Sequence, residues 1–111
     1  MVIKIFLHLS KDEQHTRLLE RIDKPEKNWK FSQDDLKERE RWGAYRKAYE
    51  ALLGATSTKD APWYIVPADS KKNARLIVSQ IILDRLDQLK LAYPVSTEAR
   101  QEELAAIGKE L

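Results

Sequence analysis

The 111-residue sequence has no cysteine, only three glycines and four prolines, and no long apolar run. The absence of cysteine excludes disulfides, thiolate catalysis and zinc sites with cysteine ligands. Gly43, Gly54 and Gly108 are scattered, so the chain has no glycine-rich loop that could cradle a phosphate. No segment approaches the ~20 apolar residues of a membrane span, and the start MVIKIFLHLS lacks a signal-peptide pattern. We therefore expect a soluble, cytoplasmic protein.

Charge is plentiful and nearly balanced. Charged residues make up 34% of the sequence and apolar residues 42%, and 20 Lys and Arg oppose 18 Asp and Glu. These values are typical of one helix-rich domain with solvated helix faces. The net charge of +2 argues neither for nor against a polyanionic partner, so any such evidence must come from local clusters.

Two short apolar segments predict strands. In VIKIFLHL (residues 2–9) apolar side chains fall on both faces, which is typical of a parallel strand buried on both sides. WYIV (residues 63–66), closed by Pro67, predicts a second strand. Because a long helical stretch separates them, the two strands should be parallel neighbours. Two strands alone cannot form a covered parallel sheet, so we expect the missing strands from sequence outside this chain or from a second copy.

Cap residues and helical spacing predict the rest of the chain as helix. Ser10 with Glu13 begins the first helix, Pro25 stops it, and Ser32 with Asp35 begins the second. Gly54 is the expected C-cap of that second helix. The third helix has a wide apolar stripe and should pack against a large partner surface. The expected helices span about residues 11–23, 33–53, 71–90 and 98–111.

Three groups of cations are candidate anion-binding positions. The first lies on the first helix, where Gln14, Arg17, Arg21 and Lys24 share one face. Guanidinium groups bind phosphate oxygens bidentately, so this face suits phosphate. The alternative is a solvated face supported by the ion pairs Glu13–Arg17 and Glu20–Lys24.

The second group lies in the connector KPEKNWKFSQDD (residues 24–35), where lysines alternate with Trp29 and Phe31. Lys27 and Lys30 could line a path for a polyanion, with the aromatic rings available for stacking. Alternatively, the two aromatic side chains anchor an ordinary turn to the core and the lysines remain in water.

The third group follows the second strand, in the string ADSKKNAR. Ligands of open α/β sheets gather at the carboxyl ends of the strands, and Lys71, Lys72 and Arg75 come directly after one. Cations in the first turn oppose the helix dipole, so they require either an anionic ligand or a carboxylate partner, for which Asp69 is the candidate. We find no nucleophile–base pair, and His8 and His15 lack a third ligand at metal spacing.

Long ordered strings carry a resemblance to a known family. The sequence resembles the C-terminal half of the polyphosphate kinase 2 family over about Ile3 to Pro94. The similar segments are FLHLSKDEQ, RLLERIDKPEKNWKFSQDDLKERERWGAYRKAYEALLGATST, APWYIVPAD and SKKNARLIVSQIILDRL. The strings KNWKFS, ATST followed by APW, and VPAD are the most specific.

The resemblance implies a helix-rich α/β fold, namely the C-terminal part of a P-loop kinase α/β/α sandwich with two strands, about four helices and a mobile helical lid. Family members transfer phosphoryl groups between inorganic polyphosphate and nucleotides with Mg²⁺. In such enzymes the phosphate loop and the magnesium ligands precede this region, so no catalytic or metal-binding residue is expected here. Polyphosphate and nucleotides are the implied partners, with no DNA, RNA or membrane. The implied phosphate-binding residues are Arg17, Arg21, Lys30, Lys71 and Arg75.

From this resemblance we expect residues 1–94 to form part of a kinase domain, with the lid at about residues 11–54, and residues 95–111 to form a helical tail. The chain should be a fragment of a phosphotransferase that is inactive alone and associates with itself through the edge of its first strand and the stripe of residues 71–90. The alternative is a non-enzymatic helical module, derived from the same fold, that binds polyanions or a partner protein.

Overall fold

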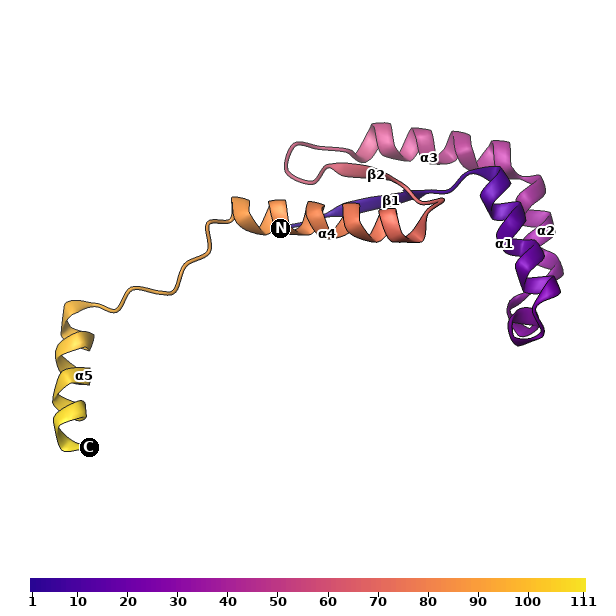
Figure 1. Ribbon diagram of the computed structural model, residues 1–111. Coiled ribbons are helices and arrows are strands. Elements are labelled where there is room, and N and C mark those ends of the chain that lie inside the picture. The colour runs from indigo at the N-terminus through magenta and orange to yellow at the C-terminus, as the bar shows by residue number, and fades with distance from the viewer.

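The computed structural model describes all 111 residues and consists mainly of helices around a small sheet (Figure 1). One segment, η1, is a 3₁₀ helix. In chain order the elements are β1 (Lys4–His8), α1 (Lys11–Asp23), η1 (Pro25–Lys30), α2 (Gln33–Glu40), α3 (Trp42–Thr56), β2 (Trp63–Pro67), α4 (Lys71–Gln88) and α5 (Glu98–Glu110).

The two strands pair in parallel, as predicted, with Lys4 opposite Trp63 and His8 opposite Pro67. The Ala68 amide extends the pairing by donating to the His8 carbonyl at 2.9 Å. Figure 1 shows α3 and α4 on opposite sides of the strands. One helix therefore lies on each face of the sheet, and the loops after both strands lie at the same end.

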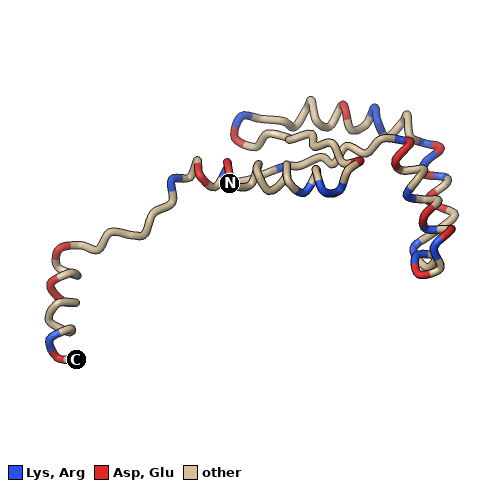
Figure 2. The backbone as a smooth tube through the Cα atoms, viewed as in Figure 1, with Lys and Arg blue, Asp and Glu red and all other residues tan.

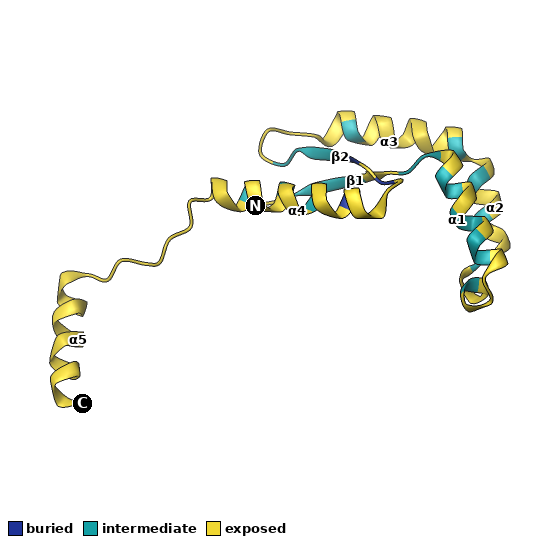
Figure 3. Cartoon of the chain, in the orientation of Figure 1, coloured by how far each residue is buried: buried dark blue, intermediate teal, exposed yellow.

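The core is very small. Only Val66, Ala68 and Ala74 are buried, and the side chains packed against them come from both strands and from Val78 and Ile81 of α4. β1 was predicted to be buried on both faces, but its residues are half-buried or exposed in this chain. Figure 3 shows that most of the ribbon is exposed or half-buried. With one helix on each face, Leu7 and Ile65 remain 57% and 60% exposed, so the burial typical of a parallel strand is not reached within these residues.

The predicted second helix is two helices, α2 and α3, separated at Arg41. Arg41 has φ −87° and ψ 13°, and its amide bonds to the carbonyls of Arg39 and Glu38, which ends α2. The prediction that Gly54 caps the helix is wrong, because α3 continues to Thr56. The end of α3 is closed by the Thr56 hydroxyl, which donates to the Leu52 carbonyl at 2.6 Å, and by the Ser57 amide. These bonds satisfy terminal carbonyls without a left-handed glycine.

The chain is elongated, with a radius of gyration of 23.9 Å and extents of 71 × 39 × 22 Å. At one end, α1, η1 and α2 form a helical hairpin that turns away from the sheet; we call residues 11–40 the arm (Figure 1). At the other end, an extended segment leads to α5, which stands apart from the rest. None of the helices combines the length and the apolar character that crossing a membrane requires.

Candidate functional site

The site candidate lies where the two strands end. Ser10, directly after β1, is the N-cap of α1, and its hydroxyl accepts the Glu13 amide at 3.1 Å. The Ser10 amide in turn donates to a carboxylate oxygen of Asp69 at 2.7 Å, which connects the β1–α1 loop to the β2–α4 loop. The paired strands thus bring residues 59 positions apart into one cluster. This is the end of a parallel sheet at which open α/β proteins bind ligands.

Arg17 fastens the arm to this cluster. Its Nη2 donates to the Ala68 carbonyl at 2.9 Å and to the Asp69 carbonyl at 2.8 Å, and its Nε pairs with Glu13 at 3.0 Å. A guanidinium has five N–H groups, and these bonds use the two on Nη2 and the one on Nε. Only Nη1 remains free for another ligand. The predicted pair Glu13–Arg17 is confirmed, and the additional role of Arg17 as a structural tie between the arm and the sheet was not predicted.

Asp69 stays ionised because of its neighbours. The hydrogen bonds from the Ser10 amide and then the Ser10 side chain lower the pKa of the Asp69 carboxyl, and the charges of Arg17 and His8 lower it further. The ionised carboxylate therefore holds the β1–α1 loop and the β2–α4 loop together. The interpretation that Asp69 is the partner of the cations at the start of α4 is wrong, because Asp69 instead accepts the Ser10 amide.

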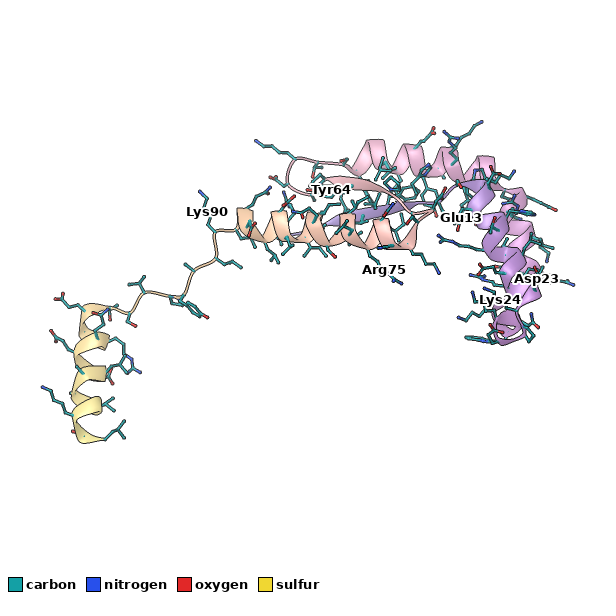
Figure 4. The ribbon with its side chains drawn as sticks, in the orientation of Figure 1. Glu13, Asp23, Lys24, Tyr64, Arg75 and Lys90 are labelled. Carbon is teal, nitrogen blue, oxygen red and sulfur yellow. The ribbon has the colours of Figure 1, made fainter.

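Lys71, Lys72 and Arg75 occupy the first turns of α4 and make no ion pair in this chain. All three are exposed. Figure 2 shows the concentration of positive charge at this end of α4, and in Figure 4 Arg75 projects to the side toward which the arm turns. Cations at the positive end of a helix dipole are unfavourable without a counter-charge. The arrangement therefore leaves a cationic surface next to the strand ends.

Cations on the arm are mostly paired, as the mixed colours of the arm in Figure 2 illustrate. Arg21 lies 3.5 Å from Asp35 of α2. The predicted pair Glu20–Lys24 is present at 3.6 Å, and Lys27 also reaches Glu20 at 2.8 Å. The hydrogen bond from Lys27, followed by the charges of Lys24 and Lys27, lowers the pKa of Glu20. Along this face, phosphate would have to compete with carboxylates.

The tip of the arm differs from the expected anchored turn. Trp29 is 79% exposed, with its indole N–H bonded to the Glu26 carbonyl and the Lys30 ammonium 5.1 Å from its ring centre. The hypothesis that Trp29 anchors the turn to the core is therefore wrong, since the arm extends away from the core. Asn28 holds the tip instead, and its amide donates to carbonyls at the end of α1, those of Arg21 and Ile22 at 2.7 Å each. No periodicity in the sequence marks Asn28 for this role.

An apolar groove of about 600 Å³ lies along the sheet face beside α3. The Phe6 and Tyr49 rings, whose centres are 4.9 Å apart, contribute to one wall. The Tyr45 hydroxyl bonds to Glu38, which raises the pKa of Tyr45. Ile65 borders the groove and is 60% exposed. The groove has the character of an uncovered sheet face.

The chain lacks the groups that would bind a metal ion or form a phosphate-binding loop. No three His, Asp or Glu side chains are grouped so that they could hold a metal ion. All three glycines lie inside helices and none has a positive φ, so none forms the tight backbone cradle of a phosphate loop. The Mg²⁺ implied by the resemblance does not fit the residues present, and it would need ligands from elsewhere.

Comparisons with known proteins agree with this anatomy. The sequence model of the polyphosphate kinase 2 family matches residues 1–94. The crystal structure of polyphosphate kinase 2 from Arthrobacter aurescens TC1 superimposes with a TM-score of 0.80 at 43% identity, and the alignment covers 94% of this chain and 38% of that one. The fold is thus that of part of a polyphosphate kinase 2 domain, and the chain belongs to the polyphosphate kinase 2 family.

Two relatives differ in how much of them the chain covers. The ADP-polyphosphate phosphotransferase of Rhodopseudomonas palustris is 57% identical over 110 residues, which are 99% of this chain and 38% of that protein. An uncharacterized protein in the chlN 3' region of Leptolyngbya boryana is 50% identical, and the alignment covers all of this chain and 82% of that protein. The alignments therefore span between about a quarter and two-fifths of the length of the phosphotransferase relatives.

Proposed function

We propose that the chain is the phosphate-holding part of a phosphotransferase that moves phosphoryl groups between inorganic polyphosphate and nucleotides in the cytoplasm. The observation that carries the proposal is the family match over residues 1–94. The names of relatives that act on ADP, AMP and GDP support the substrate class. Residues 1–94 form part of a P-loop kinase domain in this proposal, and residues 95–111 form a helical tail.

The arm, together with α3, is the lid in this proposal and covers about residues 11–54. Arg21 and Lys30 contribute cations from the arm, and Lys71 and Arg75 contribute cations from the sheet end. Arg17 links the two sets through its carbonyl contacts and has its Nη1 edge left for phosphate. The unpaired state of the α4 cations supports their assignment, because an anionic ligand would satisfy them.

Electrostatic clamping is what these residues can do chemically. Phosphoryl transfer spreads negative charge over the transferred group, and fixed cations stabilise that charge. The chain supplies neither a glycine-rich loop nor a group of metal-binding side chains. We therefore propose that it does not turn over alone, and that it associates with itself through its uncovered sheet and α4 surfaces.

The alternative is a non-enzymatic module that binds polyanions. It is favoured by the L. boryana relative, because the alignment covers 82% of that relative but only 38% of the R. palustris phosphotransferase, so that relative is much shorter. The two functions are distinguished by turnover: the module binds polyphosphate but transfers nothing, even when the remainder of a kinase domain is supplied.

The test combines a binding assay and a transfer assay. Replacing Lys71 and Arg75 by Ala should weaken polyphosphate binding by the chain about tenfold, because each contributes a charge-assisted contact. The matched control replaces Lys59 and Lys109, which are exposed cations outside the site and the lid, and removes the same net charge. Equal losses in both double variants would assign binding to overall charge and overturn the site. Turnover of polyphosphate, Mg²⁺ and nucleoside mono- or diphosphates by the chain alone would contradict its proposed inactivity.

A further inference from the structure

Four hydrogen bonds close a ring across the ends of the two strands. The Ser10 amide donates to the Asp69 carboxylate at 2.7 Å, and the Ser10 hydroxyl accepts the Glu13 amide at 3.1 Å. The Glu13 carboxylate accepts a bond from Arg17 Nε at 3.0 Å, and Arg17 Nη2 donates to the Asp69 carbonyl at 2.8 Å. The ring therefore joins the β1–α1 loop, the first turns of α1 and the β2–α4 loop.

This ring fixes the orientation of the Arg17 guanidinium. Of its five N–H groups, the one on Nε bonds to Glu13 and the two on Nη2 bond to the carbonyls of Ala68 and Asp69. Because the guanidinium is planar, bonds on Nε and Nη2 also set the direction of the Nη1 edge. The Arg17 side chain is 28% exposed, so a ligand can reach that edge from solvent. The free edge is therefore held in one direction before any ligand binds.

Two acids belong to this ring, although an acid opposes an anionic ligand. Glu13 pairs with Arg17, and Asp69 directly precedes the start of α4, where the unpaired cations lie. On charge alone, both carboxylates reduce the attraction of this surface for polyphosphate. Asp69 is exposed, so water and salt screen its charge, whereas the hydrogen bonds that it accepts are directional. Their contribution to an anion site is therefore geometric.

We propose that Asp69 and Glu13 are positioning residues of the phosphate-binding site. Asp69 holds the start of α4 against the β1–α1 loop, and Glu13 holds the Arg17 guanidinium from the arm. The Nη1 edge of Arg17 and the cations of α4 are thereby preorganised to bind one polyphosphate chain, which lowers the cost of binding. This inference rests on the proposed function, since it concerns how the same cations hold the same ligand. It predicts that loss of either acid weakens the binding of a polyanion, which is opposite to the effect of charge.

The experiment separates the hydrogen bond from the charge. Asp69→Ala and Asp69→Asn remove the same charge, but Asn retains an acceptor for the Ser10 amide. Binding of inorganic polyphosphate of one chain length to the 111-residue protein is measured by titration calorimetry at several salt concentrations. We expect Asp69→Ala to weaken binding about threefold and the slope of log K against log salt to become shallower by about one, because one phosphate contact is lost. Asp69→Asn should bind at least as tightly as the native chain.

Glu13 provides a second pair of variants that does not alter the loop after β2. Glu13→Ala should weaken binding, whereas Glu13→Gln retains an acceptor for Arg17 Nε and should not. Asp60→Ala is the matched control for charge, since Asp60 is an exposed acid outside the ring, and its binding should be unchanged or slightly tighter. A measurement without ligand follows the Arg17 Nε–H by nitrogen-15 NMR. Its exchange with water should be faster in both alanine variants than in the native chain and the amide variants.

The positioning role is overturned if both alanine variants bind polyphosphate as tightly as the native chain, or if alanine and amide variants weaken binding equally. Unchanged Nε–H exchange in Glu13→Ala and Asp69→Ala would also contradict it. Failure of the proposed function gives a different result: a native chain that binds no polyphosphate has no such site, and the positioning role falls with it. If the loss of Lys71 and Arg75 weakens binding but the loss of either acid does not, the site stands and only the positioning role is rejected.

Discussion

The arm and the sheet region of this chain are stabilised in different ways. The arm is held together by polar contacts between residues close in sequence. These contacts between α1, η1 and α2 are capping bonds, the ion pairs of Glu20 and Arg21, and the hydrogen bonds of the Asn28 amide. The sheet region depends on apolar contacts between distant segments, and only Val66, Ala68 and Ala74 are buried there.

This difference indicates which part of the chain depends on contacts between distant segments. Polar contacts within the arm satisfy one another, and Arg17 ties the hairpin to the sheet. The apolar faces of β1 and β2 are only half covered, and their stability depends on what packs on the other half. Substitutions in the sheet should therefore have little effect on the stability of the arm. Substitutions in the arm should likewise have little effect on the sheet, except at Arg17 and Asp69, which connect the two.

The largest effect is expected from Val66→Ala. Removing two methyl groups from the only fully buried large side chain should lower the free energy of unfolding by about 2 kcal/mol. Urea titration at a fixed protein concentration, followed by tryptophan fluorescence, would measure the loss.

Ile65→Ala is the control for this prediction, since it removes more carbon from an exposed neighbour in the same strand. It should change the stability of the chain alone by less than about 0.5 kcal/mol. Equal costs for Val66 and Ile65 in the chain alone would show that the core has been misplaced.

A smaller effect is expected from Arg17→Gln, which removes the tie between the two regions. The loss of two charge-assisted bonds to carbonyls should cost about 1.5 kcal/mol, given that the guanidinium is partly exposed. Hydrogen exchange should increase at the base of α1 and in the loop after β2. Arg46→Gln, which breaks an exposed pair with Glu50 on α3, should cost less than about 0.5 kcal/mol. If hydrogen exchange were unchanged in Arg17→Gln, the stability of the arm would not depend on its contacts with the sheet.

The smallest effect is the pH dependence due to Asp69. Its pKa in the folded chain lies below the ordinary value, mainly because of the Ser10 bonds, so the ionised carboxylate stabilises the fold above about pH 4. That contribution is lost as the pH falls through the lowered pKa. The difference in melting temperature between the native chain and Asp69→Asn should therefore be larger at pH 6 than near pH 2. Asp60→Asn, in an exposed loop without a hydrogen bond, should show no such difference.

Much of the local structure follows from the sequence. Ser10 and Ser32 cap helices, Pro25 separates two helical segments, and the apolar runs form paired parallel strands. These features depend on side chains within a few positions of one another, or on strong apolar patterns. The cations proposed to bind phosphate were also found from spacing and family resemblance, although their role remains a prediction.

Other features could not be predicted because they depend on contacts across the fold. Nothing near Arg17 in the sequence indicates that its guanidinium reaches carbonyls 51 and 52 residues away. Asp69 likewise bonds to Ser10 and not to its neighbouring cations. Trp29 was expected to anchor a turn because large aromatic side chains are usually buried, but the arm carries it away from any core.

The sequence by itself determined the order of the elements, their capping residues and the family, because these depend on local hydrogen bonding, periodicity and ordered strings of residues. Only the tertiary structure decided which halves of the sheet are covered, that Arg17 and Asp69 join the arm to the strand ends, and that Lys71, Lys72 and Arg75 have no carboxylate partner. The physical reason is that burial and ion pairing depend on distances between residues far apart in the chain. The pairing of β1 with β2 sets those distances.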